Sequence, residues 1–290
     1  MTRVLYAHER QALAKEIHDA IDKYCENTYN DGHRNHLGAS LIGGECKRYM
    51  WYVFRWVKEV RAPGRMARLF NRGHKEEARF IEWLRGIGFR IWDTDDNGNQ
   101  TRISGVGGHY GGSLDSVGMA PEWLRMLVEV GPILVEYKTH GERSFTKLVK
   151  EGVKVSKPTH WVQMCTYGRY YKFKYALYCA INKNDDDLHI EIVELDWSVA
   201  DENYRKAEEV IQAVKPPLRL SELPSYFKCK TCDMAEVCHR SADYEKNCRS
   251  CNYAVPVKDG EWFCGYNNGV IPKDFIKVGC QQWKPVGRNG

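Results

Sequence analysis

The alternation of apolar and polar positions along the chain predicts a mixed α/β fold. Apolar residues recur at helical spacing, as at Met66, Leu69 and Phe70, which is typical of a helix with one packed face. Shorter alternating runs, separated by Gly or Asn-Gly, predict strands. The predicted helices cover residues 7–30, 45–60, 65–85, 142–152, 158–172 and 198–214, and the predicted strands cover 89–93, 101–106, 109–117, 132–138, 175–183 and 188–196.

Composition narrows the class of protein. The 290 residues carry a net charge of +5, which permits a nucleic-acid partner without requiring one. The chain contains no run of about 18 apolar residues, and its first 24 residues lack the apolar core of a secretion signal. These features, together with eleven cysteines and no sign of a disulfide framework, predict a protein of the reducing cytoplasm.

The stretch ILVEYKTH, residues 133–140, places a carboxylate and an ammonium group in an otherwise apolar strand. Alternation puts Ile133, Val135 and Tyr137 on one face of the strand, and Leu134, Glu136 and Lys138 on the other. Asp115 lies near the end of the preceding strand, and twenty residues separate it from Glu136, so a hairpin would bring the two carboxylates together. Neighbouring carboxylates repel each other unless a divalent cation lies between them.

The spacing of Asp115, Glu136 and Lys138 resembles the core motif of the PD-(D/E)XK nuclease superfamily, and in particular its RecB-like and phage-type exonucleases. Two further stretches support the resemblance. Residues 73–84 resemble the family's first motif, with Glu77 four residues after a glycine, and residues 160–171 contain Gln163 and Tyr167 at the Q-x-x-x-Y spacing. The implied fold is a restriction-endonuclease-like core, a mixed central sheet flanked by helices.

The resemblance also implies roles for these residues. Asp115 and Glu136 would bind one or two Mg²⁺ or Mn²⁺ ions, with the Tyr137 carbonyl as a further ligand. Glu77 would complete the metal shell directly or through water, and Lys138 would orient the attacking water. The residues Gln163 and Tyr167 would position the lysine and a DNA phosphate.

Seven of the eleven cysteines fall within residues 229–280, and this clustering indicates metal binding. The first set is Cys229, Cys232 and Cys238, with either His239 or the distant Cys46 as a fourth ligand. In the resembling nucleases, three C-terminal cysteines and one before the core bind a [4Fe-4S] cluster, which implies the set Cys46, Cys229, Cys232 and Cys238. Zinc is the alternative for this set.

The second set of cysteines has the spacing of a small zinc ribbon. Its members lie among glycines outside the usual nuclease core, where tetrahedral thiolate coordination suits zinc. A second iron–sulfur centre is the alternative. The set consists of Cys248, Cys251, Cys264 and Cys280.

Three basic stretches are candidates for contact with DNA, because lysine and arginine neutralise phosphate and aromatic rings stack on unpaired bases. The candidate residues are Arg65, Arg68, Arg72, Lys147, Arg169 and Lys172.

The sequence therefore predicts three parts: an N-terminal helix (1–34), a nuclease core that includes the iron–sulfur ligands (35–240) and a zinc-ribbon-like module (241–290). The expected function is a Mg²⁺- or Mn²⁺-dependent deoxyribonuclease, an exonuclease acting on DNA ends or single strands in a bacterial or phage-infected cell. A recombination or CRISPR-adaptation protein is a possible partner by likeness. The alternative is a non-catalytic DNA-binding or adaptor protein that keeps the fold.

Overall fold

The computed structural model describes residues 3–30 and 32–287, and it confirms the mixed α/β class. The central sheet has five strands in the order β2-β5-β6-β7-β8. The strands β6 and β7 run parallel and every other neighbouring pair in this sheet is antiparallel. The strands of this sheet are β2 (Arg90–Trp92), β5 (Ser116–Met119), β6 (Ile133–His140), β7 (Tyr175–Asn182) and β8 (Leu188–Glu194).

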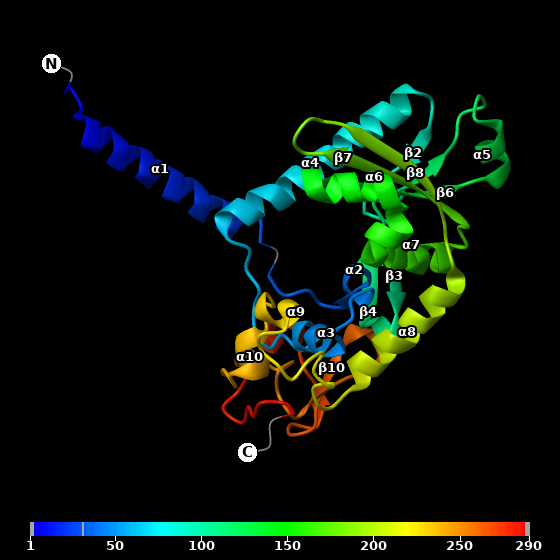
Figure 1. Ribbon diagram of the computed structural model, residues 1–290. Coiled ribbons are helices and arrows are strands. Elements are labelled where there is room, and N and C mark those ends of the chain that lie inside the picture. Colours follow the sequence, from blue (N-terminus) through cyan, green and yellow to red (C-terminus); the bar gives the residue numbers. More distant parts are fainter. Residues whose placement is uncertain (1–2, 31, 288–290) are drawn as a thin grey trace.

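Helices cover both faces of this sheet (Figure 1). On one face, Phe80 and Leu84 of α4 pack into a cluster with Val135 and the other odd-numbered residues of the β6 apolar run. On the opposite face, Leu134 joins a cluster with residues of α6 and α7. The predicted alternation along residues 133–138 is therefore confirmed, and it turns Glu136 and Lys138 toward α7. The helices around the sheet are α4 (Gly64–Gly86), α5 (Arg125–Val130), α6 (Glu142–Ser156), α7 (Pro158–Tyr171) and α8 (Trp197–Gln212).

The single strand predicted for residues 109–117 is wrong. The chain leaves one sheet after β4 (Tyr110–Ser113) and enters the central sheet at β5. β4 lies between β3 (Arg102–Gly105) and β1 (Leu37–Gly38) in a separate three-stranded sheet. Just after β4, the backbone N–H of Leu114 donates to the carbonyl of Thr101 at 2.9 Å. Asp115 therefore lies at a corner between two sheets.

Two predicted helix limits also differ. The helix expected over 45–60 is α3 (Lys47–Phe54), which begins after Cys46, whose sulfur accepts the N–H of Tyr49 at 3.4 Å. It stops early because Trp56 adopts a positive φ of 52°, and its indole N–H donates to the Arg34 carbonyl at 2.8 Å. The helix expected over 142–152 continues to Ser156 through a kink at Gly152.

The C-terminal segment has more regular structure than its sequence pattern suggests. A small antiparallel sheet of order β11-β10-β9 is built there, and its residue Trp262 belongs to the same buried cluster as Leu37 and Trp51. The hydrophobic core thus continues from the central sheet into the cysteine-rich segment. The remaining elements are α2 (Ala39–Ile42), α9 (Phe227–Lys230), α10 (Ala235–His239), α11 (Lys273–Ile276), β9 (Ala254–Pro256), β10 (Trp262–Cys264) and β11 (Gly269–Val270).

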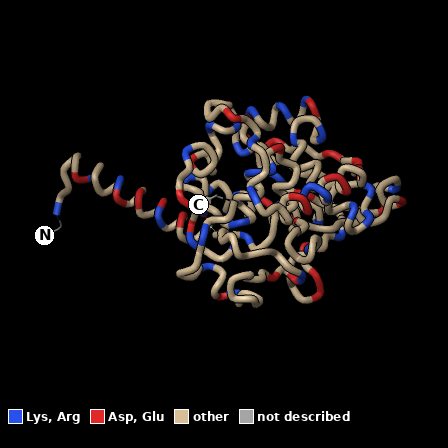
Figure 2. The backbone as a smooth tube through the Cα atoms, turned by 90° about the horizontal axis from the view of Figure 1, so that it is seen from below, with Lys and Arg blue, Asp and Glu red and all other residues tan. Residues whose placement is uncertain are grey.

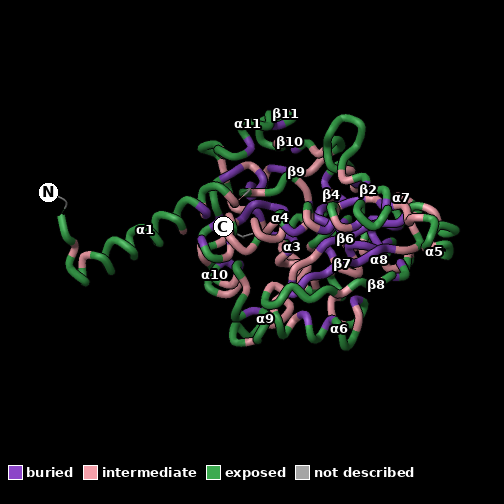
Figure 3. Tube along the Cα trace, turned by 90° about the horizontal axis from the view of Figure 1, so that it is seen from above, coloured by how far each residue is buried: buried purple, intermediate pink, exposed green. Residues whose placement is uncertain are grey.

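The first helix, α1 (Ala7–Thr28), projects from the body as an arm (Figure 1) and is exposed over most of its length (Figure 3). Its C-terminal end is fastened to the start of α4 by an ion pair between Asp22 and Arg68, and by the N–H of Gly64, which donates to Glu26 at 2.8 Å. A Cβ at position 64 would lie 2.6 Å from the Asp22 Cα, so the close approach of the two helices requires glycine.

Among the described residues, none of the helices combines the length and the apolar character that a membrane span needs.

Candidate active site

Asp115 and Glu136 come together because β5 and β6 are antiparallel neighbours. The register pairs Ser116 with Val135, and one further step places Asp115 beside Glu136. Asp115 does not continue the ladder, so its Oδ2 accepts the backbone N–H of Tyr137 at 3.0 Å. The hairpin therefore holds both carboxylates at the N-terminal end of β5.

The ammonium group of Lys138 is surrounded by three oxygens from these two strands. Its Nζ lies 3.4 Å from Asp115 Oδ2 and 3.0 Å from the Tyr137 carbonyl oxygen, and it contacts Glu136 Oε1 directly. These oxygens belong to the three residues predicted as metal ligands. The Lys138 ammonium group therefore occupies the position where the sequence predicts a divalent ion, and binding of that ion stays a prediction.

Glu136 is fully buried, and within the described residues one of its two oxygens has a partner. Oε1 contacts Lys138 and accepts from Gln163, whereas Oε2 is buried without a hydrogen bond. Burial raises the pKa of Glu136 to about 7, and the nearby Asp115 adds to the rise while Lys138 opposes it. Burial alone would lower the pKa of Lys138, but the charges of Asp115 and Glu136 raise it above its ordinary value. The site therefore favours additional positive charge.

Glu77 reaches the same region from α4. Burial raises the pKa of Glu77, and the charge of Asp115 contributes next. His74, one turn earlier, lies 3.4 Å from Glu77 Oε1. The adjacent Glu76 is instead held by Arg79 at 2.6 Å. Of the two consecutive glutamates, Glu77 is the one whose charge acts on the β5–β6 carboxylates.

Gln163 and Tyr167 of α7 lie side by side above β6. Gln163 Nε2 donates to Glu136 Oε1 at 3.2 Å and to the Tyr167 hydroxyl at 3.5 Å. The Tyr167 hydroxyl would lie 2.5 Å from a Cβ at position 112, so Gly112 leaves the space that the phenol occupies. Both predicted helix residues therefore join the carboxylate site, and Gly112 is a part of it that the sequence analysis missed.

Sequence reasoning also missed a polar cluster beside Lys138. Tyr178 is the β7 residue paired with Glu136, and its hydroxyl contacts His160 Nδ1 at 2.8 Å and His140 Nε2 at 3.0 Å. Burial lowers the pKa of His160 to about 3 and that of His140 to about 4, and Lys138 is among the positive charges that add to both shifts. His160 precedes Gln163 by three residues, and this helical spacing was a signal for its location.

As the side chains stand, no three His, Cys, Asp or Glu residues in the described ranges are grouped so that they could hold a metal ion. Asp115 and Glu136 do not form such a group because the Lys138 ammonium occupies the space that their oxygens share. A divalent ion at this point requires Lys138 to move off these oxygens.

Comparison with known proteins gives distant structural similarities only. No family model and no curated protein sequence matches the chain. The crystal structure of SSO0001 is similar with a TM-score of 0.46 and 14% identity, over 79% of this chain and 99% of that one. The alkaline exonuclease LHK-Exo from Laribacter hongkongensis is similar with a TM-score of 0.40 and 12% identity, over 65% of this chain and 90% of that one. A second structure of LHK-Exo, in complex with dAMP, gives a TM-score of 0.40 and 13% identity, over 66% and 90% of the two chains. At identities this low, the chemistry of the site is inferred from its own residues.

Most of the residues predicted to contact DNA form ion pairs with carboxylates of the chain itself. Arg68 pairs with Asp22 and Arg169 with Asp201, while Arg72 and Lys147 each lie 3.6 Å from a glutamate on their own helix. Figure 2 shows basic and acidic positions interspersed along the trace. Arg65 contacts the sulfur of Met66, and Lys172 ends α7 with a positive φ of 63°. A DNA track along these residues stays a prediction.

The first set of cysteines surrounds one cavity of about 580 Å³. Cys46 reaches it from the start of α3, Cys229 and Cys238 reach it from α9 and α10, and Cys232 reaches it from the turn between these two helices. Burial raises the pKa of the Cys229 thiol, and the nearby Cys238 and Cys46 add to the rise. His239, the other candidate ligand, lines the same cavity.

The second set surrounds a separate, smaller cavity of about 350 Å³, whose lining includes Cys248, Cys251, Cys264 and Cys280. Burial raises the pKa of Cys248, followed by the effects of the other three thiols. The fold therefore gathers each predicted set around one cavity, although within the described residues neither set is arranged so that it could hold an ion as it stands.

Proposed function

We propose that the chain is a deoxyribonuclease that uses Mg²⁺ or Mn²⁺ to hydrolyse phosphodiester bonds. The observation that supports this most is the Lys138 ammonium, held by oxygens of Asp115, Glu136 and Tyr137. These are hard oxygen donors, of the kind that divalent cations prefer. The buried and unpartnered Glu136 Oε2 provides a further acceptor.

Each side chain of the site has a role in this proposal. A divalent ion, when bound, supplies a polarised water and positive charge on the phosphate. Asp115, Glu136 and the Tyr137 carbonyl hold that ion, and Glu77 joins them directly or through a water. Lys138, once displaced, hydrogen-bonds the attacking water and offsets the developing charge. Gln163 fixes Glu136 Oε1, and Tyr167 fixes Gln163.

The resemblance found in the sequence extends the proposal to the substrate. It favours an exonuclease acting on DNA ends or on single strands. Arg65 and Lys172, which lack a carboxylate partner within the described residues, are the basic residues best placed to contact phosphate. A recombination or CRISPR-adaptation protein remains the kind of partner that the resemblance suggests.

The proposal predicts cleavage of end-labelled linear DNA in Mg²⁺ or Mn²⁺, with no cleavage in EDTA and recovery when Mg²⁺ is added in excess. The physical reason is that Asp115 and Glu136 repel each other and the attacking water lacks activation without the divalent ion. Covalently closed DNA, which has no end, is the matched control and is expected to resist an exonuclease. Binding of DNA without cleavage in any of these conditions would instead identify a non-catalytic DNA-binding protein.

We propose in addition that Cys46, Cys229, Cys232 and Cys238 bind a [4Fe-4S] cluster. All four thiols line one cavity, and the cavity is larger than that of the second set. The donor set, four cysteines, is the one that such clusters use. By joining residue 46 to residue 229, the cluster would close a long loop and stabilise the fold.

Cys46 distinguishes this assignment from one that uses His239. Protein purified without oxygen is expected to be brown and to contain iron and sulfide, and Cys46→Ala is expected to lose most of both, because a three-thiolate site is open to solvent. Iron and acid-labile sulfide analysis measures the loss. Cys25→Ala, which removes a buried thiol of α1, is the control and should keep the cluster. Full iron content in Cys46→Ala together with its loss in His239→Ala would assign the histidine.

A further inference from the structure

Two arginines are buried in the core that joins the central sheet to the cysteine-rich segment. Arg55 and Arg249 are each 1% exposed. Arg249 stacks on the rings of Trp56, Phe54 and Trp262 with its Cζ 4.4 to 4.7 Å from their centroids, and Arg55 lies 5.0 Å from Trp262. The two guanidinium groups therefore both lie against aromatic rings, and they share contact with Trp262.

Within the residues that the structure describes, neither guanidinium has a carboxylate partner. Arg55 donates to the carbonyls of Ala254 at 2.8 Å and Arg249 at 3.4 Å, and Arg249 donates to the Arg34 carbonyl at 3.2 Å. Arg55 Nε, Arg249 Nε and Arg249 Nη2 are buried without any hydrogen bond. Burial lowers the pKa of Arg55 to about 10. Unpaired buried charges are costly, so this core lacks two negative charges.

The second set of cysteines lies next to Arg55 along the chain that its guanidinium binds, and thiolates there would supply negative charge. Cys251 is the group that opposes the fall in the pKa of Arg55. The carbonyls that Arg55 holds belong to Arg249 and Ala254, on either side of Cys251, so its guanidinium fixes the turn from Cys248 to Cys251. This turn is closed by the N–H of Cys251, which donates to the Cys248 carbonyl at 3.1 Å.

The other two thiols are presented to the same cavity. The backbone N–H of Asn267 donates to Cys264 Sγ at 3.4 Å, so the chain turns back around that sulfur. Cys248, Cys251, Cys264 and Cys280 all line the one cavity of about 350 Å³. Four thiols around a small cavity match the tetrahedral coordination of a single zinc ion.

We propose that Cys248, Cys251, Cys264 and Cys280 bind one Zn²⁺ as a tetrathiolate centre, and that Arg55 and Arg249 are its buried counter-ions. On binding, four S–H bonds break, four Zn–S bonds form and four protons leave to solvent. Four thiolates and one Zn²⁺ carry a net charge of two negative units, which the two guanidinium ions cancel.

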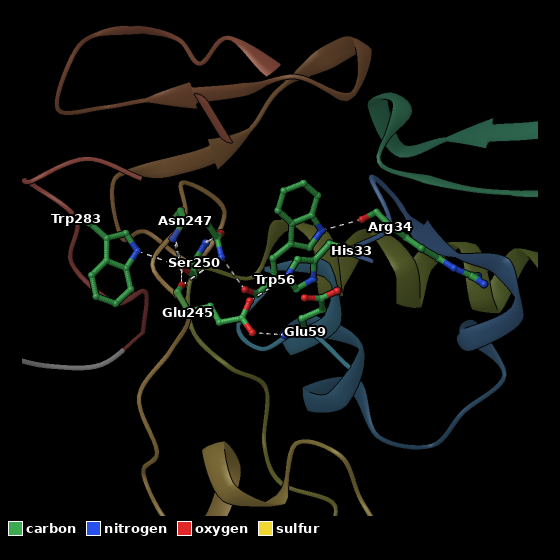
Figure 4. Close-up of polar contacts among 8 residues, drawn as sticks. All are labelled: His33, Arg34, Trp56, Glu59, Glu245, Asn247, Ser250 and Trp283. Atoms are coloured by element: carbon green, nitrogen blue, oxygen red, sulfur yellow. Dashed lines mark hydrogen bonds and ion pairs between the residues drawn. The ribbon is translucent and has the colours of Figure 1, made fainter. Parts of the chain in front are cut away.

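The counter-ions also couple the metal to the rest of the fold. Figure 4 shows polar contacts of Trp56, on whose ring Arg249 stacks: Asn247 Nδ2 donates to the Trp56 carbonyl at 2.8 Å, and the Trp56 indole N–H donates to the Arg34 carbonyl. Glu245 accepts the backbone N–H of Glu59 at 2.6 Å and lies 3.0 Å from His33 Nε2. Loss of the metal leaves two uncompensated cations beside these contacts, and so destabilises the whole junction.

The test compares the zinc affinity and the thermal stability of the full chain with the variants Arg55→Met, Arg249→Met and the double variant. Methionine keeps the apolar contacts and removes the charge. Competition with a chromophoric chelator is expected to show zinc bound about 10- to 100-fold less tightly in each single variant, as for other groups that support metal ligands. In the metal-free state the variants are expected to melt at the same or a higher temperature than the wild type, because an unpaired buried charge has gone.

The expected change in melting temperature therefore differs between the zinc-bound and the metal-free protein, and this difference separates a counter-ion from a residue that only packs. A packing role would lower the melting temperature equally with and without zinc, and that result would overturn the proposal. Arg48→Met is the matched control: Arg48 stacks on Tyr52 at the other cysteine cavity and should leave the zinc affinity unchanged. Should the Arg249 variants fail to fold, Arg55→Lys must still bind zinc more tightly than Arg55→Met, because it keeps the charge. The zinc assignment would also be overturned if the metal that Cys264→Ser removes were iron, or if the intact protein contained no metal bound by this set of cysteines.

Discussion

Replacing Lys138 with methionine is expected to lower the rate of DNA cleavage by at least ~10²-fold while leaving Mn²⁺ binding intact or tighter. The ammonium group has two effects that the substitution separates. In the proposed mechanism it orients water and offsets charge during the reaction, and in the resting site it contacts the oxygens of Asp115 and Glu136. Its removal ends the first effect and also removes a competitor for the metal.

Single-turnover cleavage and calorimetric titration with Mn²⁺ measure the two effects separately. Lys183→Met removes a partly buried lysine at the end of the neighbouring strand and is the control, with an unchanged rate expected. Equal loss of metal binding and of cleavage in Lys138→Met would show that the lysine only supports the structure. Cleavage at the wild-type rate would remove Lys138 from the site altogether.

Asp115→Asn is expected to lose both properties, with cleavage again falling by at least ~10²-fold. The amide has the shape of the carboxylate, and its oxygen can still accept the Tyr137 N–H, so the corner between the two sheets is kept. What it lacks is the charge that attracts a divalent ion. The same two measurements therefore give opposite results for metal binding in Asp115→Asn and Lys138→Met.

Asp93→Asn is the matched control for Asp115, since it changes a carboxylate that pairs with Arg85 at the surface. A variant Asp115→Asn that binds Mn²⁺ as tightly as the wild type would contradict the role of this carboxylate as a ligand. Because the two site variants test different properties, failure of one leaves the other informative.

Local patterns in the sequence were sufficient to predict the hairpin that joins Asp115 to Glu136. Strand alternation gives the face of Glu136 and Lys138, and helical spacing places Gln163 and Tyr167 on the same side of α7. Both rules depend only on residues near each other in the chain. They therefore held for β6 and for α7 beside it.

What the sequence did not reveal depends on distant partners. The break after β4 follows from its pairing with β1, where Tyr110 lies opposite Leu37, and no local signal indicates that parallel contact. The DNA candidates Arg68 and Arg169 looked free because Asp22 and Asp201 lie 46 and 32 residues away. The sequence analysis gave no role to Arg55 and Arg249, since the burial of a charge cannot be predicted from its neighbours in the chain.

The projecting helix α1 gives the molecule an elongated outline. Its 22 residues span about 33 Å at 1.5 Å per residue, and its fastening to α4 at Gly64 and Arg68 leaves the far end away from the body. Such an arm holds little mass but extends the largest interatomic distance. Small-angle X-ray scattering of the monomer would therefore show a distance distribution with a long, shallow tail, and tumbling in solution would be slower than for a sphere of the same mass.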